Sequence, residues 1–553
     1  MENSNARWIR VLIITVILFL IGLLYWLFWC HCWHCRKDRD NFTGRNDVQT
    51  VRIEPQRVEG GHYPPFETPK GEVESNEGPY YHVPTGPIRG SVTPSNNNFQ
   101  LMQIKENSGQ YGGGAGADPV VFKQYDRFGN LINSFGIPPD PSGARSGNVI
   151  LYTFNTRAVL STNGGANYTL IDPTTIFPSG PTKDGSGNWL DGGLCCDQVI
   201  QYVPSIDRVI WLMQFCGAAT NTGGSCLSGV NRVRIASASP QDIINSNGTS
   251  WTYWDLLSST FGLGTATMDY PDLSVGDNNL YFEIDAVGTG SFVARIPLTQ
   301  IQNSQTINID YTSASDGNTT YGGHLCQNTG NEIFWAGHVN NSTLRVFSLK
   351  EGDNRYYWRD IGINTWPNGT ISSIAKNGTT DWLQYLGTNF PGNAVLGAAR
   401  EGNNVWFAWT ASSGGGFPRA HIQMARIDIT NYSLKEQVQI WNPDIAFAFP
   451  ALSTNANGEL GMSLLWGGNK DWGNHAVGIW GDFIVWYPEL SDTAITRAGD
   501  YLACRRASPN STLWDASGYA VLKNASFTTG YLFDVYYIQF GRNSNVNGGS
   551  PIK

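Results

Sequence analysis

The region after about residue 148 is built of short apolar runs that alternate with turns rich in Gly and Asn. Within it, a strand, a tight turn and a more apolar strand recur as a unit, at residues 198–215, 271–287, 324–339, 394–411, 448–468 and 501–521. Successive units begin about 61 residues apart. Two further strands follow each of the first four units, so the repeat consists of four strands.

This repeat predicts an all-β fold and, within that class, a β-propeller. Four antiparallel strands in each of several units of about 50–60 residues are typical of propeller blades. The second strands favour a propeller over a sandwich. Residues 209–213 and 405–409 are apolar on both faces, whereas a sandwich strand alternates apolar with polar residues. A blade lies between two neighbours, which cover both of its faces.

A further piece at 148–177 supplies strands for one more blade. If it counts as a blade of its own, with 118–137 completing it, the propeller has seven blades. If it closes the last blade, there are six. We expect seven blades in a propeller that spans residues 118–545, followed by a C-terminal tail at 546–553.

The N-terminal part has a different pattern. Residues 11–29 are without a charge, and a helix of that length spans about 28 Å, close to the hydrocarbon thickness of a bilayer. No small-residue cleavage site follows, so we predict an uncleaved transmembrane helix after an N-terminal tail at 1–10. Residues 30–117 are rich in Pro, Gly, Glu and Asn without a sustained hydrophobic period, which predicts a juxtamembrane segment and a disordered stalk.

Positive charges on the two sides of this helix nearly balance, so other features must decide its orientation. Eleven N-x-[ST] sequons follow the helix. Cys216 and Cys226 enclose a short loop of the kind that a disulfide closes in an oxidising compartment. Both features favour a single-pass membrane protein whose C-terminal domain is extracellular or lumenal.

Three cysteines, Cys30, Cys32 and Cys35, lie directly after the predicted helix. They suit three interpretations: a metal site, S-acylation at the membrane, or interchain disulfides in a homo-oligomer. The pairing of four further cysteines is open, and either a vicinal disulfide or a bond between blades would fit: Cys195, Cys196, Cys326 and Cys504.

The charge balance limits the partners. The 553 residues include 36 Lys+Arg and 45 Asp+Glu, a formal net charge of −9. This argues against nucleic-acid binding, which needs clustered Lys and Arg. Aromatic residues make up 12% and charged residues only 15%, the reverse of a disordered chain. The sequence contains no Walker loop, dinucleotide fingerprint, nucleophile elbow or HExxH motif.

Residues 161–168, Ser-Thr-Asn-Gly-Gly-Ala-Asn-Tyr, resemble the Asp-box (Ser-x-Asp-x-Gly-x-Thr-Trp) of sialidases and related propellers. Asn163 stands for the Asp, Asn167 for the Thr and Tyr168 for the Trp, so only the Ser and the Gly are identical. In that family the box is the turn between the third and fourth strands of a blade, which implies the fold and no chemistry. The family's Arg-Ile-Pro motif precedes its first Asp-box, whereas the one here, at 295–297, lies in a later blade. No catalytic residue is therefore carried over.

Propeller geometry predicts where a ligand would bind. Innermost strands all run in the same direction, so their N-terminal ends gather on one face, together with the loops between second and third strands. We call the opening of the central channel on that face the entry mouth. The residues that we expect to line it are Asp197, Asp272, His324, Asp471, Trp472, His475 and Asp500. Arg400, Arg505 and Arg506 fall at the opposite ends of the inner strands, so an arginine clamp built from them requires the opposite face.

Carboxylates, imidazoles and an indole at one mouth suit a sugar stacked on Trp472 or a structural cation in the channel, and paired carboxylates suit acid–base hydrolysis. Apart from that cation, we expect no cofactor. The predicted function is a membrane-anchored surface module that recognises a glycan or a cell-surface protein. The alternatives are a membrane-tethered, sialidase-like glycoside hydrolase and a purely structural surface protein.

Overall fold

The structure is a computed structural model, and it describes most of the chain after residue 117. The described residues are 16, 20, 42–65, 103–106, 118–129, 139–217, 229–388, 393–468, 470–497, 499–526 and 530–547. The predicted N-terminal tail and the cysteines Cys30, Cys32 and Cys35 lie outside them. Of the predicted transmembrane helix only Val16 and Leu20 are described, and no helix within the described part of the chain combines the length and the apolar character needed to cross a membrane.

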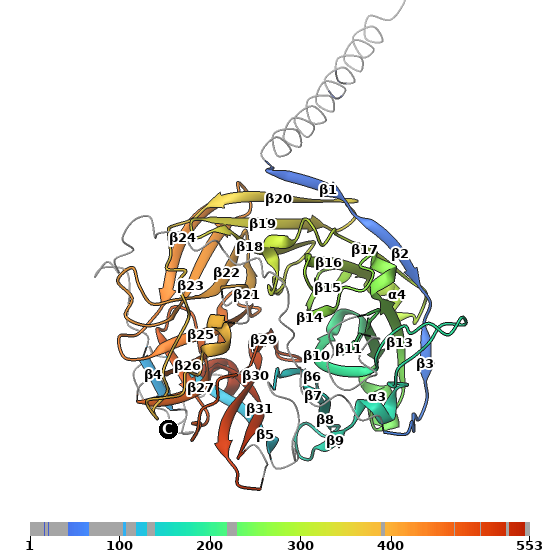
Figure 1. The fold of residues 1–553 in the computed structure, drawn as a ribbon, viewed down its shortest axis with the longest axis horizontal. Coiled ribbons are helices and arrows are strands. Elements are labelled where there is room, and N and C mark those ends of the chain that lie inside the picture. Colours follow the sequence, from blue (N-terminus) through green and yellow to red (C-terminus); the bar gives the residue numbers. More distant parts are fainter. Residues whose placement is uncertain are drawn as a thin grey trace, which may run out of the picture.

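Seven separate sheets surround a central axis (Figure 1). This confirms the all-β fold and the seven-blade β-propeller, and the six-blade alternative is wrong. The first three blades consist of β6 (Ser142–Ser146), β7 (Val149–Phe154), β8 (Arg157–Ser161) and β9 (Thr169–Ile171); β10 (Leu194–Val203), β11 (Arg208–Phe215), β12 (Arg232–Ala238) and β13 (Trp251–Leu257); and β14 (Met268–Val275), β15 (Asn279–Ala286), β16 (Gly290–Pro297) and β17 (Ile307–Tyr311).

The remaining four blades complete the ring. They consist of β18 (Glu332–Asn340), β19 (Thr343–Lys350) and β20 (Arg355–Gly362); β21 (Val395–Glu401), β22 (Asn404–Ala411), β23 (His421–Asp428) and β24 (Ser433–Ile440); β25 (Ala446–Thr454), β26 (Leu460–Gly468), β27 (Asp471–Ile479) and β28 (Ile484–Tyr487); and β29 (Ala503–Arg506), β30 (Trp514–Lys523), β31 (Tyr531–Arg542) and β5 (Val120–Arg127). Short helices lie in the connections: α2 (Pro173–Ile176), η2 (Pro204–Ile206), α3 (Pro240–Ser246), η4 (Ser258–Phe261), α4 (Leu298–Gln302), η5 (Asn318–Thr320), α5 (Gln384–Thr388) and α6 (Asn543–Asn547).

The innermost segment of the fourth blade is irregular, although the repeat predicts a strand there. The Cys326 amide donates to Phe334 O in the same blade (2.9 Å), whereas the Gln327 amide donates to Ala398 O in the fifth blade (2.9 Å). Segment 324–330 therefore bridges two blades at the axis.

The ring is closed by β5, which pairs antiparallel with β31. A strand from before the first blade thus becomes the outermost strand of the last blade. The expectation that 118–137 completes the blade of 148–177 is wrong, since β9 already supplies a fourth strand there. Phe122 and Tyr125 of β5 pack against the apolar cluster of the last two blades, which fixes this register.

Part of the predicted stalk is also folded. Strands β1 (Gly44–Asp47), β2 (Gln49–Ile53) and β3 (Gln56–Val58) add outer strands to the fourth, third and second blades in turn, and β4 (Gln103–Glu106) pairs with β28 of the sixth. Figure 1 shows β1–β3 as a blue band along the rim; we call it the outer strap.

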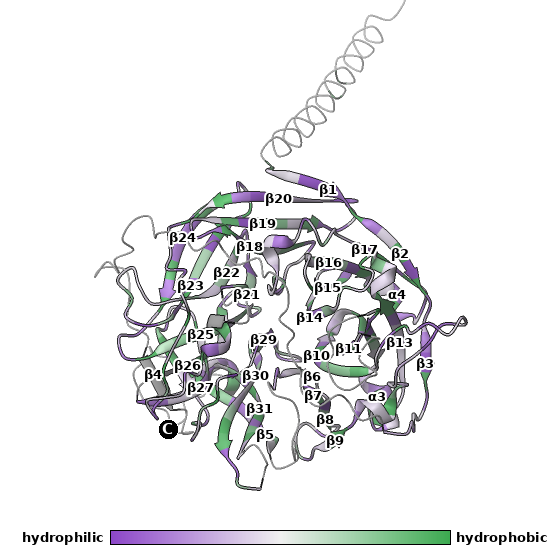
Figure 2. Cartoon of the chain, viewed as in Figure 1, coloured by the Kyte–Doolittle hydropathy of each residue, from purple (hydrophilic) through white to green (hydrophobic). Residues whose placement is uncertain are grey.

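The strap corrects the expectation of disorder from 30 to 117. Most of its residues are polar and exposed (Figure 2), which is why its sequence looks like a linker. Val51 and Ile53, two residues apart, nevertheless pack on the third blade, and Val58 is buried against the second. Alternation over so few residues is too short to stand out from a polar background.

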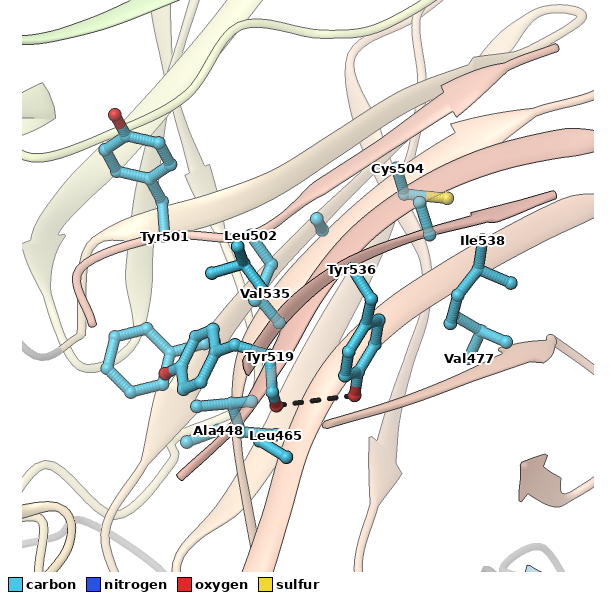
Figure 3. Packing of buried hydrophobic residues seen from close by; sticks show 14 of the residues in the cluster. Ala448, Leu465, Val477, Tyr501, Leu502, Cys504, Tyr519, Val535, Tyr536 and Ile538 are labelled. Carbon is cyan, nitrogen blue, oxygen red and sulfur yellow. Dashed lines mark hydrogen bonds between the residues drawn. The ribbon is translucent and has the colours of Figure 1, made fainter. Parts of the chain in front are cut away.

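The blades cohere because apolar side chains fill the space between them, as the two-faced strands predict. Between the sixth and seventh blades, Val477 and Leu465 pack with Val535 and Ile538 (Figure 3). The Tyr536 hydroxyl donates to Tyr519 O (3.3 Å), so its polar atom is satisfied within the core.

Candidate functional site

The entry mouth is filled by aromatic side chains. The His324 ring lies between Tyr270 and Tyr501, with ring centroids 5.4 and 5.5 Å away. The Tyr270 hydroxyl donates to Asp500 O (2.8 Å). Burial, followed by the nearby carboxylates of Asp500, Asp140 and others, raises the pKa of Tyr270. The hydroxyl is therefore a neutral hydrogen-bond donor.

Four predicted entry-mouth residues do lie at this end of the channel, but they are buried. The exposed fractions are 2% for Asp197, 4% for Asp272, 8% for His324 and 6% for Asp500. Asp272 Oδ2 accepts from the Leu325 amide (2.9 Å). Burial lowers the pKa of His324 and raises that of Asp500. These side chains are enclosed within the protein and do not line an open pocket.

A cover formed by two connections between strands lies over these buried side chains. Segment 363–388, between β20 and β21, packs Trp382, Leu383 and Tyr385 into the same apolar cluster as Tyr501. Its Tyr385 amide donates to Thr496 O in the second connection, 488–500 (3.3 Å). The repeat does not predict this cover, because neither connection belongs to the four-strand unit.

Of the other three predicted residues, Asp471 and Trp472 lie beside the cover. The Lys376 amide of the cover donates to Asp471 O (3.1 Å), and Trp472 is partly buried against the apolar cluster. His475 is fully buried between two blades, so its placement at the mouth is wrong. A Cβ at Gly518 would lie 2.1 Å from His475 Nδ1, which shows how closely the blades approach there. Burial lowers the pKa of His475 to about 3, and its Nε2 bonds Ser463 Oγ (2.7 Å).

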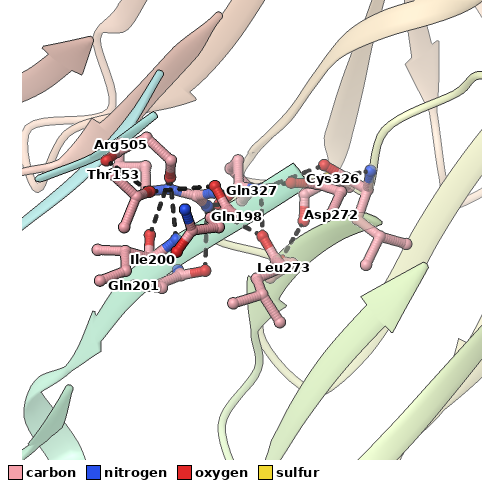
Figure 4. Close-up of polar contacts among 12 residues, drawn as sticks. Thr153, Gln198, Ile200, Gln201, Asp272, Leu273, Cys326, Gln327 and Arg505 are labelled. Carbon is pink, nitrogen blue, oxygen red and sulfur yellow. Dashed lines mark hydrogen bonds and ion pairs between the residues drawn. The ribbon is translucent and has the colours of Figure 1, made fainter. Parts of the chain in front are cut away.

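The channel itself is closed by Arg505, which reaches across the axis from β29 (Figure 4). Its Nη1 donates to Gln201 Oε1 (3.0 Å), Leu273 O (2.9 Å) and Gln327 Oε1 (3.1 Å), which belong to three other blades. Its Nη2 lies 3.6 Å from Asp272 Oδ1. The cavity left beside these groups measures about 20 Å³, room for about one water molecule. No sugar fits there.

A much larger cavity opens on the far side of Arg505. It measures about 490 Å³ and lies at the C-terminal ends of the inner strands, on the face opposite the entry mouth. We call it the exit cavity. Residues that line it include Arg145, Gln201, Tyr202, Asp277, Asn328, Arg505, Arg506, Ser511 and Asp515. Its volume falls in the range of about 300–1,000 Å³ that is usual for small-ligand sites.

Two guanidinium groups at this cavity are held by neutral acceptors. Arg506 Nε donates to Thr454 O (3.0 Å) and its Nη2 to Asn455 O (3.2 Å). Arg145 Nε donates to Gly147 O (2.9 Å), and its Nη1 bonds the Gln124 side chain. Among the ion pairs of the described residues, none involves either arginine.

A carboxyl group of unusual acidity lines the same cavity. Asp515 Oδ1 accepts from the Tyr537 hydroxyl (2.5 Å) and from Gln539 Nε2 (2.9 Å). Burial raises the pKa of Asp515 to about 6, although those two bonds and the charge of Arg145 act in the opposite direction. Asp277, by contrast, is exposed.

The predictions for the cysteines have mixed outcomes. Cys195 and Cys196 form a vicinal disulfide at the start of β10, while Cys326 and Cys504 are free and buried. Cys216 is disulfide-bonded, but its predicted partner Cys226 lies outside the described residues. The described part of the chain holds no group of three His, Cys, Asp or Glu side chains arranged to bind a metal ion.

Sequence reasoning recognised Arg505 and Arg506 as belonging to the opposite face, yet it placed the site at the entry mouth. One sequence feature could have pointed to the opposite face: an arginine ends an inner strand and is followed by a short connection to the next strand. Where Arg506 ends β29, a turn of only seven residues leads directly to β30. The entry face instead carries the long connections, which supply the cover.

Comparison with known proteins finds distant structural likenesses only. No family model matches the sequence, and no curated protein matches it. Similar solved structures include the GH93 α-L-arabinofuranosidase of Fusarium graminearum in complex with arabinobiose (11% identity, 72% of this chain and 92% of that chain, TM-score 0.34). They also include the β-propeller domain of the Trilobed protease from Pyrococcus furiosus (8%, 72% and 94%, 0.34) and a Penicillium chrysogenum α-L-arabinanase complexed with arabinobiose (8%, 72% and 92%, 0.32). Likenesses this distant carry no argument about activity.

Proposed function

We propose that this propeller is a recognition module that binds a glycan or protein ligand in the exit cavity. The observation that carries the proposal is the contrast between the two ends of the channel. The predicted entry mouth leaves about 20 Å³ beside Arg505, whereas the exit cavity offers about 490 Å³ lined by charged and neutral polar side chains. Ligand-sized space and directional polar groups coincide at the exit end.

The proposal includes a place for the module on a membrane surface. Residues 11–29 would anchor the chain, with the propeller extracellular or lumenal, and Cys30, Cys32 and Cys35 would join copies into a homo-oligomer. Support comes from the uncharged run, the sequons and the disulfide-bonded cysteines. Non-reducing electrophoresis tests the oligomer: triple substitution of these cysteines with Ser should convert a disulfide-linked species to monomer.

A cavity-filling variant tests the binding site. Ser511 lines the exit cavity, so Ser511→Trp should abolish binding to whichever ligands a glycan array and a cell-surface protein panel identify for the full-length chain in detergent. Ser526→Trp, in the exposed turn between β30 and β31, is the matched control. Ligands that bind Ser511→Trp and wild type equally would place the site elsewhere, and the absence of any ligand would favour a purely structural role.

A second candidate function is glycoside hydrolysis in the same cavity, and Asp515 is the observation that favours it. A buried carboxyl with a pKa of about 6 suits a general acid, and Asp277, exposed at the edge of the same cavity, supplies a second carboxyl group. A panel of chromogenic glycosides decides between the two functions. Turnover that disappears in Asp515→Asn supports the hydrolase, whereas binding without turnover supports the recognition module.

A further inference from the structure

The exit cavity presents positive charge on a protein whose formal net charge is −9. The guanidinium groups of Arg506 and Arg145 contribute this charge. Arg506 commits Nε and Nη2 to backbone carbonyls, and Arg145 commits Nε and Nη1 to neutral acceptors. The bonds fix both planes, and none of the described ion pairs involves either group, although the charge of Arg145 also acts on the carboxyl of Asp515. A positioned guanidinium with a free edge is the donor that best matches a carboxylate or sulfate.

The remaining charges do not cancel this preference. Arg505, at the floor, is paired at 3.6 Å with Asp272, which lies on the other side of it. Asp277 is exposed at the edge of the cavity. Asp515 carries the second carboxyl of the lining; its Oδ1 accepts from the Tyr537 hydroxyl (2.5 Å) and from Gln539 Nε2 (2.9 Å), and among the described ion pairs it is not paired with Arg506 or Arg145.

Neutral polar groups complete the lining in a way that suits sugar hydroxyls. Asn328 Nδ2 donates to Ser453 Oγ and Thr454 O (both 2.8 Å), so the amide plane is fixed and its Oδ1 is left to accept. Gln201 Oε1 is fixed in the same way by Arg505, which leaves its Nε2 to donate. Fixed amides that offer one acceptor and one donor distinguish hydroxyl-bearing ligands from purely ionic ones.

We propose that the exit cavity binds an acidic saccharide, with its carboxylate or sulfate group on Arg506 and Arg145 and its hydroxyls on the amide side chains. This rests on the proposed function and names its ligand class. An extended acidic peptide is less well suited, because peptides dock on open sheet edges or in grooves. On the second, third and fourth blades the outer edges are already taken by the strap.

The test is isothermal titration of the full-length protein in detergent with four probes: trigalacturonate, its neutral counterpart galactotriose, a sulfated galactotriose and hexaglutamate. We expect one of the two acidic saccharides to bind at least about tenfold more tightly than galactotriose, the difference that one charge-assisted contact supplies. Which of the two binds identifies the anion as carboxylate or sulfate. Arg506→Gln and Arg145→Gln should each weaken that binding about tenfold or more.

Arg52→Gln removes the same charge from the exposed strap and is the control that should leave affinity unchanged. Galactotriose binding as tightly as the acidic probes, or full affinity in both cavity variants, would overturn the inference, as would binding of hexaglutamate alone. Ser511→Trp separates this failure from that of the proposed function. If neutral ligands bind and Ser511→Trp abolishes their binding, only the acidic-saccharide inference fails; if no ligand responds to Ser511→Trp, both fail.

Discussion

The guanidinium of Arg505 joins the seventh blade to three others, so its removal should be felt by the whole ring. Arg505→Met keeps most of the side-chain volume but leaves Gln327 Oε1 without its Arg505 donor and Asp272 without its cation, whereas Leu273 O keeps its bond from Gln327 Nε2 (2.9 Å). Each buried acceptor left unpaired costs about 1–3 kcal/mol, and loss of one partner of a buried ion pair about 3–5 kcal/mol. Burial lowers the pKa of Arg505, so its own desolvation offsets part of this. We expect a net loss of about 3 kcal/mol.

Urea unfolding of the full-length protein at pH 7, followed by tryptophan fluorescence, measures this loss. Arg52→Met on the exposed strap is the control and should change the free energy of unfolding by less than about 0.5 kcal/mol. Adding Asp272→Asn to Arg505→Met should recover part of the loss, because the carboxylate left unpaired is then neutral. A loss below about 1 kcal/mol, or no recovery in the double variant, would refute the view that Arg505 closes the channel through these bonds.

Three further predictions follow from burial and close packing. The pKa of Asp515 is raised to about 6, so the stability that its protonated form provides is fully present below the ordinary carboxyl pKa and is lost as pH rises through about 6. Asp515→Asn should therefore stabilise the protein by about 1–3 kcal/mol at pH 8 and by much less at pH 4.5. Equal effects in urea unfolding at the two pH values would contradict this. Gly518→Ala drives a Cβ to within 2.1 Å of His475 Nδ1 and should cost about 3 kcal/mol or prevent folding, whereas Gly362→Ala, with nothing within 4 Å, should be tolerated in the same thermal melts. Val51→Asp should loosen the strap from the third blade and accelerate tryptic cleavage after Arg52 in limited proteolysis, while Arg45→Asp, at an exposed strap position, should not.

The blades were predictable because each strand, turn and strand lies within a few residues of its partner and is apolar on both faces. Residues 209–213 carry that signal by themselves. The closing strand β5 was assigned to the wrong blade, since its pairing with β31 joins segments about 400 residues apart and no local pattern reports such a contact. The strap was missed because Val51 and Ile53 give only one step of alternation between charged neighbours.

The sequence predicted which residues gather at each end of the channel, but not which end is open. Inner-strand direction correctly gathered Asp272, His324 and Asp500 at one end of the channel. Strand direction could not show that this end of the channel is covered, because the cover at 363–388 is a connection with no counterpart in the repeat. Arg506 was assigned to the opposite face by the same rule, but the rule did not predict the cavity of about 490 Å³ beside it. The repeat specifies the blades, whereas the connections determine which end of the channel is open.

The decisive measurement is a crystal structure of the protein in complex with trigalacturonate, or with the sulfated galactotriose if that probe binds more tightly. We expect the saccharide in the exit cavity, with its anionic group within hydrogen-bond distance of Arg506 or Arg145 and the cover at 363–388 in place. A saccharide bound at the entry mouth, stacked on Trp472 with the cover displaced, would contradict it.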